Sequence, residues 1–157
     1  MLLKHAPVTD ASAHDTGRAL LKKMYEQCFQ KAMPEILKGK RGKPYFADGS
    51  AHFSITHTCS HVFCVLSDAP VGIDAEEMDR DINLRLAQKI LSPEEKQRYE
   101  ASPNPRDTLL RFWVLKEAAG KCSGEGINGY PNHTDFHPDD PRIQICHGCY
   151  VAVITEE

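Results

Sequence analysis

The chain has 157 residues, of which 41% are hydrophobic and 26% charged, and its formal net charge is −3 at pH 7. These values are typical of one globular domain with enough apolar residues for a core. A mildly acidic chain is not expected to grip nucleic acid over a broad surface, and no stretch approaches the ~20 apolar residues of a membrane span. The N-terminus lacks the apolar run of a signal peptide, so we expect a cytoplasmic protein with reduced cysteines.

The first third of the chain predicts one helix followed by a basic loop. Apolar residues recur at helical spacing over about 15–30, and Asp15 is suited to cap this helix. Residues 35–37 favour a short strand or a turn. The loop 38–44 then carries two glycines and four cations, so a local anion site is possible although the whole chain is acidic.

Three β-rich runs follow. Residues 52–56 alternate in polarity, 62–66 form a short apolar run, and 71–76 form another strand after the turn-like 67–70. The runs 62–66 and 71–76 are close enough along the chain to pair as a hairpin.

Helices and a β-rich tail complete the chain. A short helix is predicted over 83–91, and Ser92 begins the next one with Pro93 at its first position and Glu95 completing a capping box. After the 103–105 loop, Asp107 caps a longer helix over about 108–122 that ends at glycines 124 and 126. Strands are expected over 142–146 and 149–155. Hairpins and separate helices in this order indicate an α+β fold.

Two carboxylates stand out in the strand 71–76. Asp74 and Glu76 are two residues apart, so on a strand they share one face, while Ile73 and Ala75 point to the other. Hard oxygen ligands of this kind suit Mg²⁺ together with substrate phosphates and water. The simpler interpretation is a solvated polar face at the end of a strand.

The long helix carries a second set of polar residues. Trp113, Glu117 and Lys121 are spaced by four and share one face, whereas Lys116 projects about 100° away from Glu117. An exposed Glu–Lys pair would explain the spacing as well. Gly120 favours a site, because a glycine within a helix is best tolerated where something approaches the backbone closely.

Two further segments can bind phosphate oxygens: the basic Gly42-Lys43-Pro44 and the strand end Ser54-Ile55-Thr56-His57-Thr58. Taken in order, GKP, SITHT, GIDAE, LSPEE, WVLKEAAGK and GEGI, from about Gly39 to Ile127, resemble the Sfp-type 4′-phosphopantetheinyl transferases. The resemblance implies a single transferase domain over 1–157, built as a pseudo-dimer of two similar α+β halves. These halves would cover about 1–69, which is shortened, and about 70–157.

The resemblance also implies roles for eight residues. The Mg²⁺ ligands would be Asp74, Glu76 and Glu117; the catalytic residues Glu117 and Lys121; and the coenzyme A contacts Lys43, Thr56, His57, Lys121 and Arg18. Glu117 would take the proton of the attacking hydroxyl, and Lys121 would neutralise a phosphate of the pyrophosphate. Glu95 matches a further acidic position of the family, but its capping box explains it equally well.

The implied reaction is the Mg²⁺-dependent transfer of 4′-phosphopantetheine from coenzyme A to a serine hydroxyl of an apo acyl or peptidyl carrier protein, with release of 3′,5′-ADP. An acidic carrier would face the basic loop 38–43 or another cationic surface, and neither nucleic acid nor a membrane would be a partner. Two halves in one chain imply a monomer, although the shortened first half leaves association open.

Two alternatives remain at this point. The first is a zinc-binding interaction module, which would draw its ligands from His57, Cys59, His61, Cys64 and the CxxC of residues 146–149. Against it, Cys64 lies in an apolar run, where a free cysteine is usually a small core residue. The second is a degenerate homologue that binds coenzyme A or a carrier protein without turnover.

Overall fold

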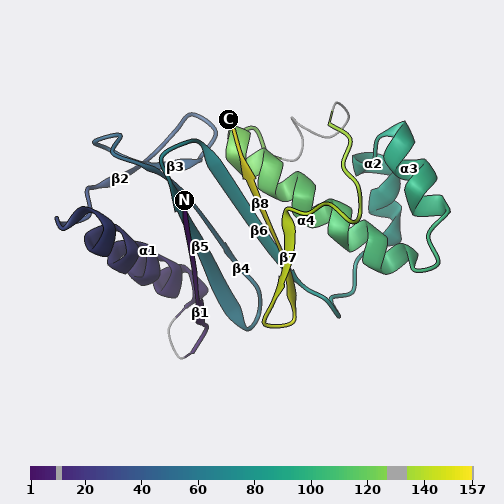
Figure 1. Ribbon diagram of the computed structural model, residues 1–157, viewed down its shortest axis with the longest axis horizontal. Coiled ribbons are helices and arrows are strands. Elements are labelled where there is room, and N and C mark those ends of the chain that lie inside the picture. The colour runs from purple at the N-terminus through teal and green to yellow at the C-terminus, as the bar shows by residue number, and fades with distance from the viewer. Residues whose placement is uncertain (10–11, 127–133, 157) are drawn as a thin grey trace.

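The structure, a computed structural model, describes residues 1–9, 12–126 and 134–156 and has the predicted α+β architecture (Figure 1). Its helices are α1 Ala13–Phe29, the 3₁₀ turn η1 Leu84–Leu86, α2 Ala87–Ile90, α3 Pro93–Glu100 and α4 Pro105–Ser123. Its strands are β1 Leu2–Pro7, β2 Ile36–Lys38, β3 Pro44–Phe46, β4 His52–His57, β5 His61–Ser67, β6 Val71–Glu77, β7 Ile143–Cys146 and β8 Cys149–Thr155. None of the helices in these described ranges is long and apolar enough to cross a membrane.

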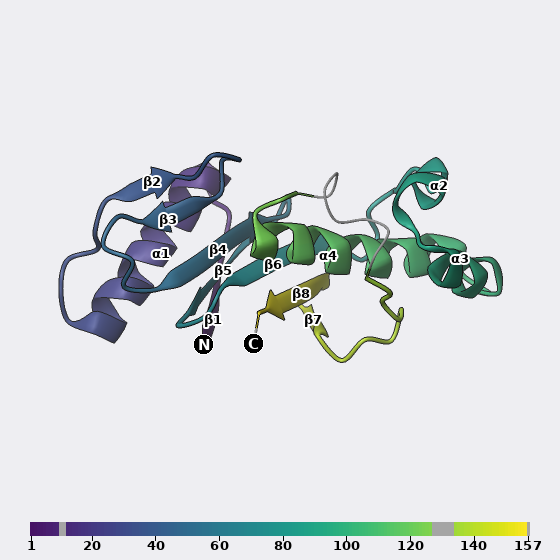
Figure 2. The ribbon, with the colours of Figure 1, turned by 90° about the horizontal axis from the view of Figure 1, so that it is seen from above.

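The strands form two three-stranded antiparallel sheets, ordered β1-β5-β4 and β6-β8-β7, and a separate β2-β3 hairpin. Each larger sheet begins with a strand, continues through helical structure and ends with a hairpin whose last strand is central. Helix α1 packs on the first sheet and α4 on the second (Figure 2). The two sheets meet where β4 lies beside β6.

The predicted hairpin between 62–66 and 71–76 is wrong. Strand β5 pairs with β1 on one edge and β4 on the other, and β6 pairs with β8. Because both edges of β5 are occupied, the turn at 67–70 must carry the chain into the second sheet. Strand β1 was not predicted, because it is an edge strand of exposed or half-buried residues with little alternation in polarity.

The predicted helices form, but two of their caps differ. Helix α1 is capped by the Ser12 hydroxyl, which accepts from the Asp15 amide at 3.1 Å, so Asp15 lies in the first turn. Helix α4 is capped by the Asn104 side chain, because Pro105 already occupies its first position. Asp107 instead accepts from the Tyr150 hydroxyl at 2.5 Å, which ties the helix to β8.

The capping box at the start of α3 is confirmed, and it belongs to a buried ion pair. Ser92 and Glu95 cap each other's backbone amides. Glu95 is fully buried and lies 2.8 Å from Lys116 Nζ, which is 1% exposed. Glu95 therefore anchors α3 against α4, which supports its structural interpretation.

Helix α4 lies unusually close to β6 because residue 72 is glycine. A Cβ atom there would stand 2.0 Å from the Ala118 carbonyl oxygen and 2.3 Å from the Cys122 nitrogen. This approach brings the last turns of the helix over the strand that carries Asp74. The helix ends as predicted, with Gly124 in the left-handed conformation (φ 75°), whereas Ile127 of the GEGI block lies outside the described residues.

Candidate active site

A buried aspartate is the centre of the site. Asp74 on β6 is 5% exposed. Its Oδ1 accepts from Lys121 Nζ at 2.7 Å and from the Thr56 hydroxyl at 3.1 Å, and the lysine also donates to that hydroxyl at 3.2 Å. Side chains from β6, α4 and β4 thus meet at one carboxylate.

The second oxygen of Asp74 is available to a ligand. Oδ2 is buried and has no hydrogen-bond partner within the described part of the chain. Burial raises the pKa of Asp74 to about 6, with Glu76 and Glu117 adding to the rise and Lys121 opposing it. A buried carboxylate oxygen without a partner is unfavourable, and a bound cation would relieve this cost.

The other two carboxylates, Glu76 and Glu117, line the same cavity as Asp74. Glu76 accepts from the Trp113 indole at 2.9 Å and from Arg80, which follows it by four residues. Glu117 is half-buried; burial and the charge of Glu76 raise its pKa, whereas Lys121 and Arg80 lower it. A carboxylate with a raised pKa is suited to accept a proton near neutral pH.

All three carboxylates line one cavity of about 310 Å³, together with Thr56, His57, Arg80, Trp113 and Lys121. Among the described residues, however, their oxygens do not form a set in which all ligand atoms lie within 4.8 Å of one another. Lys121 holds Asp74 and Arg80 holds Glu76, so two cationic side chains neutralise the acids here. The donor set, with its orphaned Oδ2, fits a hard divalent cation.

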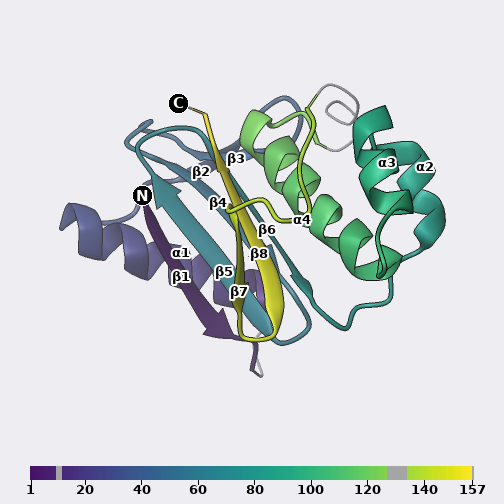
Figure 3. The same cartoon turned by 45° about the vertical axis from the view of Figure 1, so that its right-hand side comes forward.

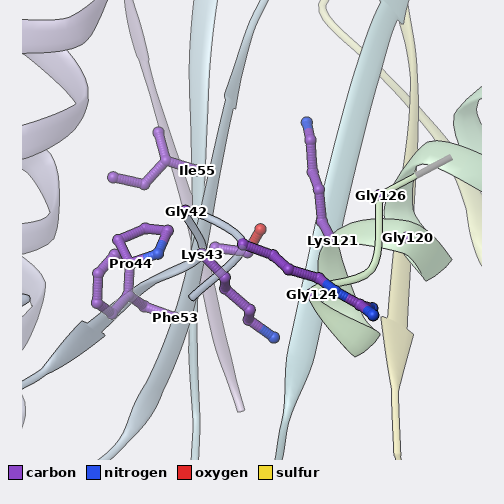
Figure 4. Close-up of a pocket in the computed structure, with 11 residues that line it drawn as sticks. Gly42, Lys43, Pro44, Phe53, Ile55, Gly120, Lys121, Gly124 and Gly126 are labelled. Carbon is purple, nitrogen blue, oxygen red and sulfur yellow. The ribbon is translucent and has the colours of Figure 1, made fainter. Parts of the chain in front are cut away.

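A second, cationic cavity adjoins the first. It measures about 300 Å³ and is bordered by the β2–β3 turn, β4 and the end of α4 (Figure 4). Arg41 and Lys43 line it from the turn, and Ile55 and Lys121 line both cavities. Lys43 also donates to the Cys122 carbonyl, and burial lowers its pKa.

Of the two remaining predicted site residues, His57 and Arg18, only His57 lines one of these cavities. His57 is exposed at the end of β4 and lines the carboxylate cavity, whereas Arg18 on α1 lines neither cavity. No role was predicted for Arg80 or Trp113, both of which donate hydrogen bonds to Glu76. The spacing of four had put Trp113 on the face of Glu117 and Lys121 without indicating that it bonds to Glu76. Arg80 follows the strand, and no local pattern marks it.

The predicted zinc ligands of the 57–64 region do not gather. Cys64 is buried in the core beneath α1, and burial raises the pKa of its thiol to about 12. His57 and Cys59 are exposed. Within the described ranges these residues do not form a group with ligand atoms inside 4.8 Å. His61 and Cys64 are three residues apart on β5, so they project to opposite faces of the sheet.

Comparisons with known proteins agree with the motif pattern. The family model described as the 4′-phosphopantetheinyl transferase superfamily matches residues 70–148, about half of the chain. The 4′-phosphopantetheinyl transferase psf-1 of Bacillus pumilus is 32% identical over 124 residues, which cover 76% of this chain and 53% of that protein. The 4′-phosphopantetheinyl transferase gsp of Aneurinibacillus migulanus is 30% identical over 129 residues, which cover 80% and 54%.

The 4′-phosphopantetheinyl transferase Sfp of Bacillus subtilis (strain 168) is 32% identical over 90 residues, which cover 55% of this chain and 40% of that protein. The chain thus spans about half the length of the first two relatives and less of the third. The matched region contains Asp74, Glu76, Glu117 and Lys121. The chain belongs to the 4′-phosphopantetheinyl transferase superfamily.

Proposed function

We propose that this protein transfers 4′-phosphopantetheine from coenzyme A to a serine hydroxyl of an apo acyl or peptidyl carrier protein, with Mg²⁺ as cofactor and 3′,5′-ADP as product. The observation that carries this proposal is the buried, unpartnered Oδ2 of Asp74 in a cavity lined by two more carboxylates. The relatives' names support the reaction, since each is a 4′-phosphopantetheinyl transferase.

The two adjoining cavities supply the groups that the phosphates of coenzyme A need: carboxylates for a bound cation in one, and cationic side chains in the other. Asp74, Glu76 and Glu117 would hold Mg²⁺, which when bound neutralises pyrophosphate charge in the transition state. Lys121 lines both cavities, which supports its proposed contact with a phosphate that would lie between them. Lys43 and Arg41, which here bind the Cys122 carbonyl and Glu125, are the proposed 3′-phosphate contacts in the cationic cavity. His57, from the carboxylate cavity, and Arg18, which lines neither cavity, are further proposed contacts of coenzyme A.

The proposed chemical step uses Glu117, which lines the carboxylate cavity, as the base. The serine oxygen attacks the β-phosphorus, the bond from this phosphorus to the oxygen bridging the two phosphates breaks, and 3′,5′-ADP leaves. The serine proton passes to Glu117, directly or through a water molecule; its raised pKa favours that role. Lys121 stabilises the negative charge that develops on the leaving phosphate.

The repeated strand order supports a pseudo-dimer as the family architecture of this chain. We place the two halves at about 1–69 and 70–157, with the first half shortened, in one monomeric domain. The first half would supply Thr56 and the cationic turn, and the second half the three carboxylates and Lys121. Size-exclusion chromatography with light scattering tests the monomer, and cell fractionation tests the cytoplasmic location.

The transferase proposal is tested by mass spectrometry of the carrier. We expect a panel of apo carrier proteins, incubated with coenzyme A and Mg²⁺, to include one that gains phosphopantetheine. EDTA or Glu117→Gln should abolish the gain, whereas Glu94→Gln, an exposed glutamate on α3, should not. If coenzyme A binds but no carrier is modified, the enzyme proposal fails and the non-catalytic homologue takes its place.

A further inference from the structure

Three histidines and a cysteine gather away from the carboxylates, where the first sheet meets the β7–β8 turn. His5 lies on β1, His61 begins β5, and Cys146 and His147 lie at the end of β7 and in the turn after it. Figure 3 shows this turn beside the strands of the first sheet. None of the four lines the carboxylate cavity.

Two of the histidines point their Nε2 atoms toward each other. His5 Nε2 and His147 Nε2 are 3.2 Å apart. The nitrogen and sulfur ligand atoms of His5, Cys146 and His147 all lie within 4.8 Å of one another, and no other set of His, Cys, Asp or Glu does so in the described part of the chain. One thiol and two imidazoles therefore converge without the help of an ion.

We propose that His5, Cys146 and His147 bind one Zn²⁺ ion, with a water molecule in the fourth position. Tetrahedral zinc has Zn–N distances of about 2.0–2.1 Å, which separates two nitrogen ligands by roughly 3.3–3.4 Å. The observed 3.2 Å separation is close to this value. A thiolate with two imidazoles is a donor set that favours zinc over Mg²⁺ or Ca²⁺.

The backbone conformation of the β7–β8 turn positions one of the proposed ligands, His147. His147 has φ 50° and Gly148 φ 73°, so this two-residue turn needs the left-handed conformation twice, where asparagine and glycine are the usual pair. Histidine at the first position is an uncommon choice for the turn itself. It projects the imidazole toward β1, where His5 meets it.

His61 supports the ligand rings. Its ring stacks on that of His147, with 4.5 Å between centroids and 17° between planes, and its Nδ1 lies 3.1 Å from the Ser60 hydroxyl. We assign it a positioning role, since a ring stacked in parallel on His147 does not direct its nitrogens at the same ion. The ion would join β1 of the first sheet to the β7–β8 hairpin of the second and fasten them together.

The competing explanation is a metal-free hydrogen bond between His5 and His147. This hydrogen bond accounts for the 3.2 Å contact but does not explain why the Cys146 thiol lies beside the two imidazoles. Cobalt(II) binding distinguishes the zinc site from the metal-free hydrogen bond. A cobalt–thiolate bond absorbs in the near ultraviolet, and the carboxylate cavity contains no cysteine. The protein is prepared without a histidine tag, kept reduced, and saturated with Mg²⁺ before Co²⁺ is added.

We expect one Co²⁺ per chain with thiolate absorption, displaced by one equivalent of Zn²⁺. Cys146→Ser should remove the band, and His5→Ala and His147→Asn should weaken Co²⁺ binding more than about tenfold. The asparagine variant keeps a residue that the turn accepts. His61→Ala should weaken binding about tenfold, the range expected for a residue that orients a ligand.

Matched controls are Cys59→Ser and His52→Ala, which change an exposed thiol and an exposed imidazole outside the cluster. Thermal unfolding in EDTA shows whether each variant folds, and added Zn²⁺ should raise the unfolding temperature of the wild type but not of Cys146→Ser. No thiolate band in the wild type, a band that survives Cys146→Ser, or unweakened binding in both histidine variants would overturn the proposal. The outcome is independent of carrier modification.

Discussion

The contact between α4 and β6 offers a sharp test of how the site is assembled. In Gly72→Ala the new Cβ would stand 2.0 Å from the Ala118 carbonyl oxygen and 2.3 Å from the Cys122 nitrogen. Ordinary van der Waals contact begins at 3.4 Å, so the helix backbone must withdraw by more than about 1 Å. Both neighbours are backbone atoms, and no side-chain rotation relieves the clash.

This displacement should lower both stability and activity. Overpacking of this kind costs about 1–3 kcal/mol of unfolding free energy. Because Lys121 lies between the two contact residues, Ala118 and Cys122, its 2.7 Å bond to Asp74 would lengthen as well. A misplacement of about 1 Å at a reacting group can reduce the rate about 100-fold, so carrier modification should fall more steeply than stability alone explains.

Urea unfolding followed by tryptophan fluorescence measures the first effect, since Trp113 is the single tryptophan and lies in the site. The matched control is Gly39→Ala, whose Cβ would lie 3.5 Å from the nearest atom, the Lys43 carbonyl oxygen, with φ outside the left-handed region. We expect it to be neutral or stabilising by about 0.4–1 kcal/mol. A Gly72→Ala protein that unfolds at the wild-type midpoint and transfers at the wild-type rate would refute the reasoning.

Three further perturbations have defined outcomes. Lys116→Met leaves the buried Glu95 without its cation and should cost about 3–5 kcal/mol of unfolding free energy, measured in urea. Burial raises the pKa of Asp74 to about 6 from its ordinary value of 3.8, so between these values the folded state holds a proton that the unfolded state releases. The stability from this group is full below the unfolded pKa and is lost as pH rises through about 6. In EDTA, the stability of Asp74→Asn relative to wild type should therefore rise by roughly 2–3 kcal/mol between about pH 4 and pH 7. Lys43→Ala should weaken coenzyme A binding about tenfold in calorimetry, because it removes a cation from the proposed phosphate cavity.

Each of these three predictions has a control variant or a result that would contradict it. Lys89→Met removes an exposed lysine of α2, and an equal loss in both methionine variants would argue against a stabilising buried pair. For Asp74→Asn, a stability difference from wild type that stays constant with pH would contradict the burial of its charge. Lys31→Ala controls for net charge, because Lys31 pairs with Asp48 and does not line the cationic cavity. An equal loss of affinity in this variant would contradict a specific phosphate site.

Local patterns in the sequence determined much of the fold and the identity of the acidic residues. The capping box of Ser92 and Glu95, the glycine that ends α4 and most strand positions follow from interactions among neighbouring residues. The alternation of a strand placed Asp74 and Glu76 together, and the helical repeat placed Glu117 and Lys121 on one face. Both relations depend only on spacing, so the chain order of residues was enough to predict them.

The partners of those residues were decided by tertiary structure. Spacing favoured a Glu117–Lys121 pair, yet Lys121 bonds to Asp74, because Gly72 lets α4 approach β6 backbone to backbone. Likewise, β6 joins β8 since β1 and β4 already occupy both edges of β5. Edge occupancy and the closeness of a helix to a strand depend on segments far apart in the chain. For the same reason only the fold brought His5 to Cys146 and His147, and only the fold left one oxygen of Asp74 buried without a partner in the described chain.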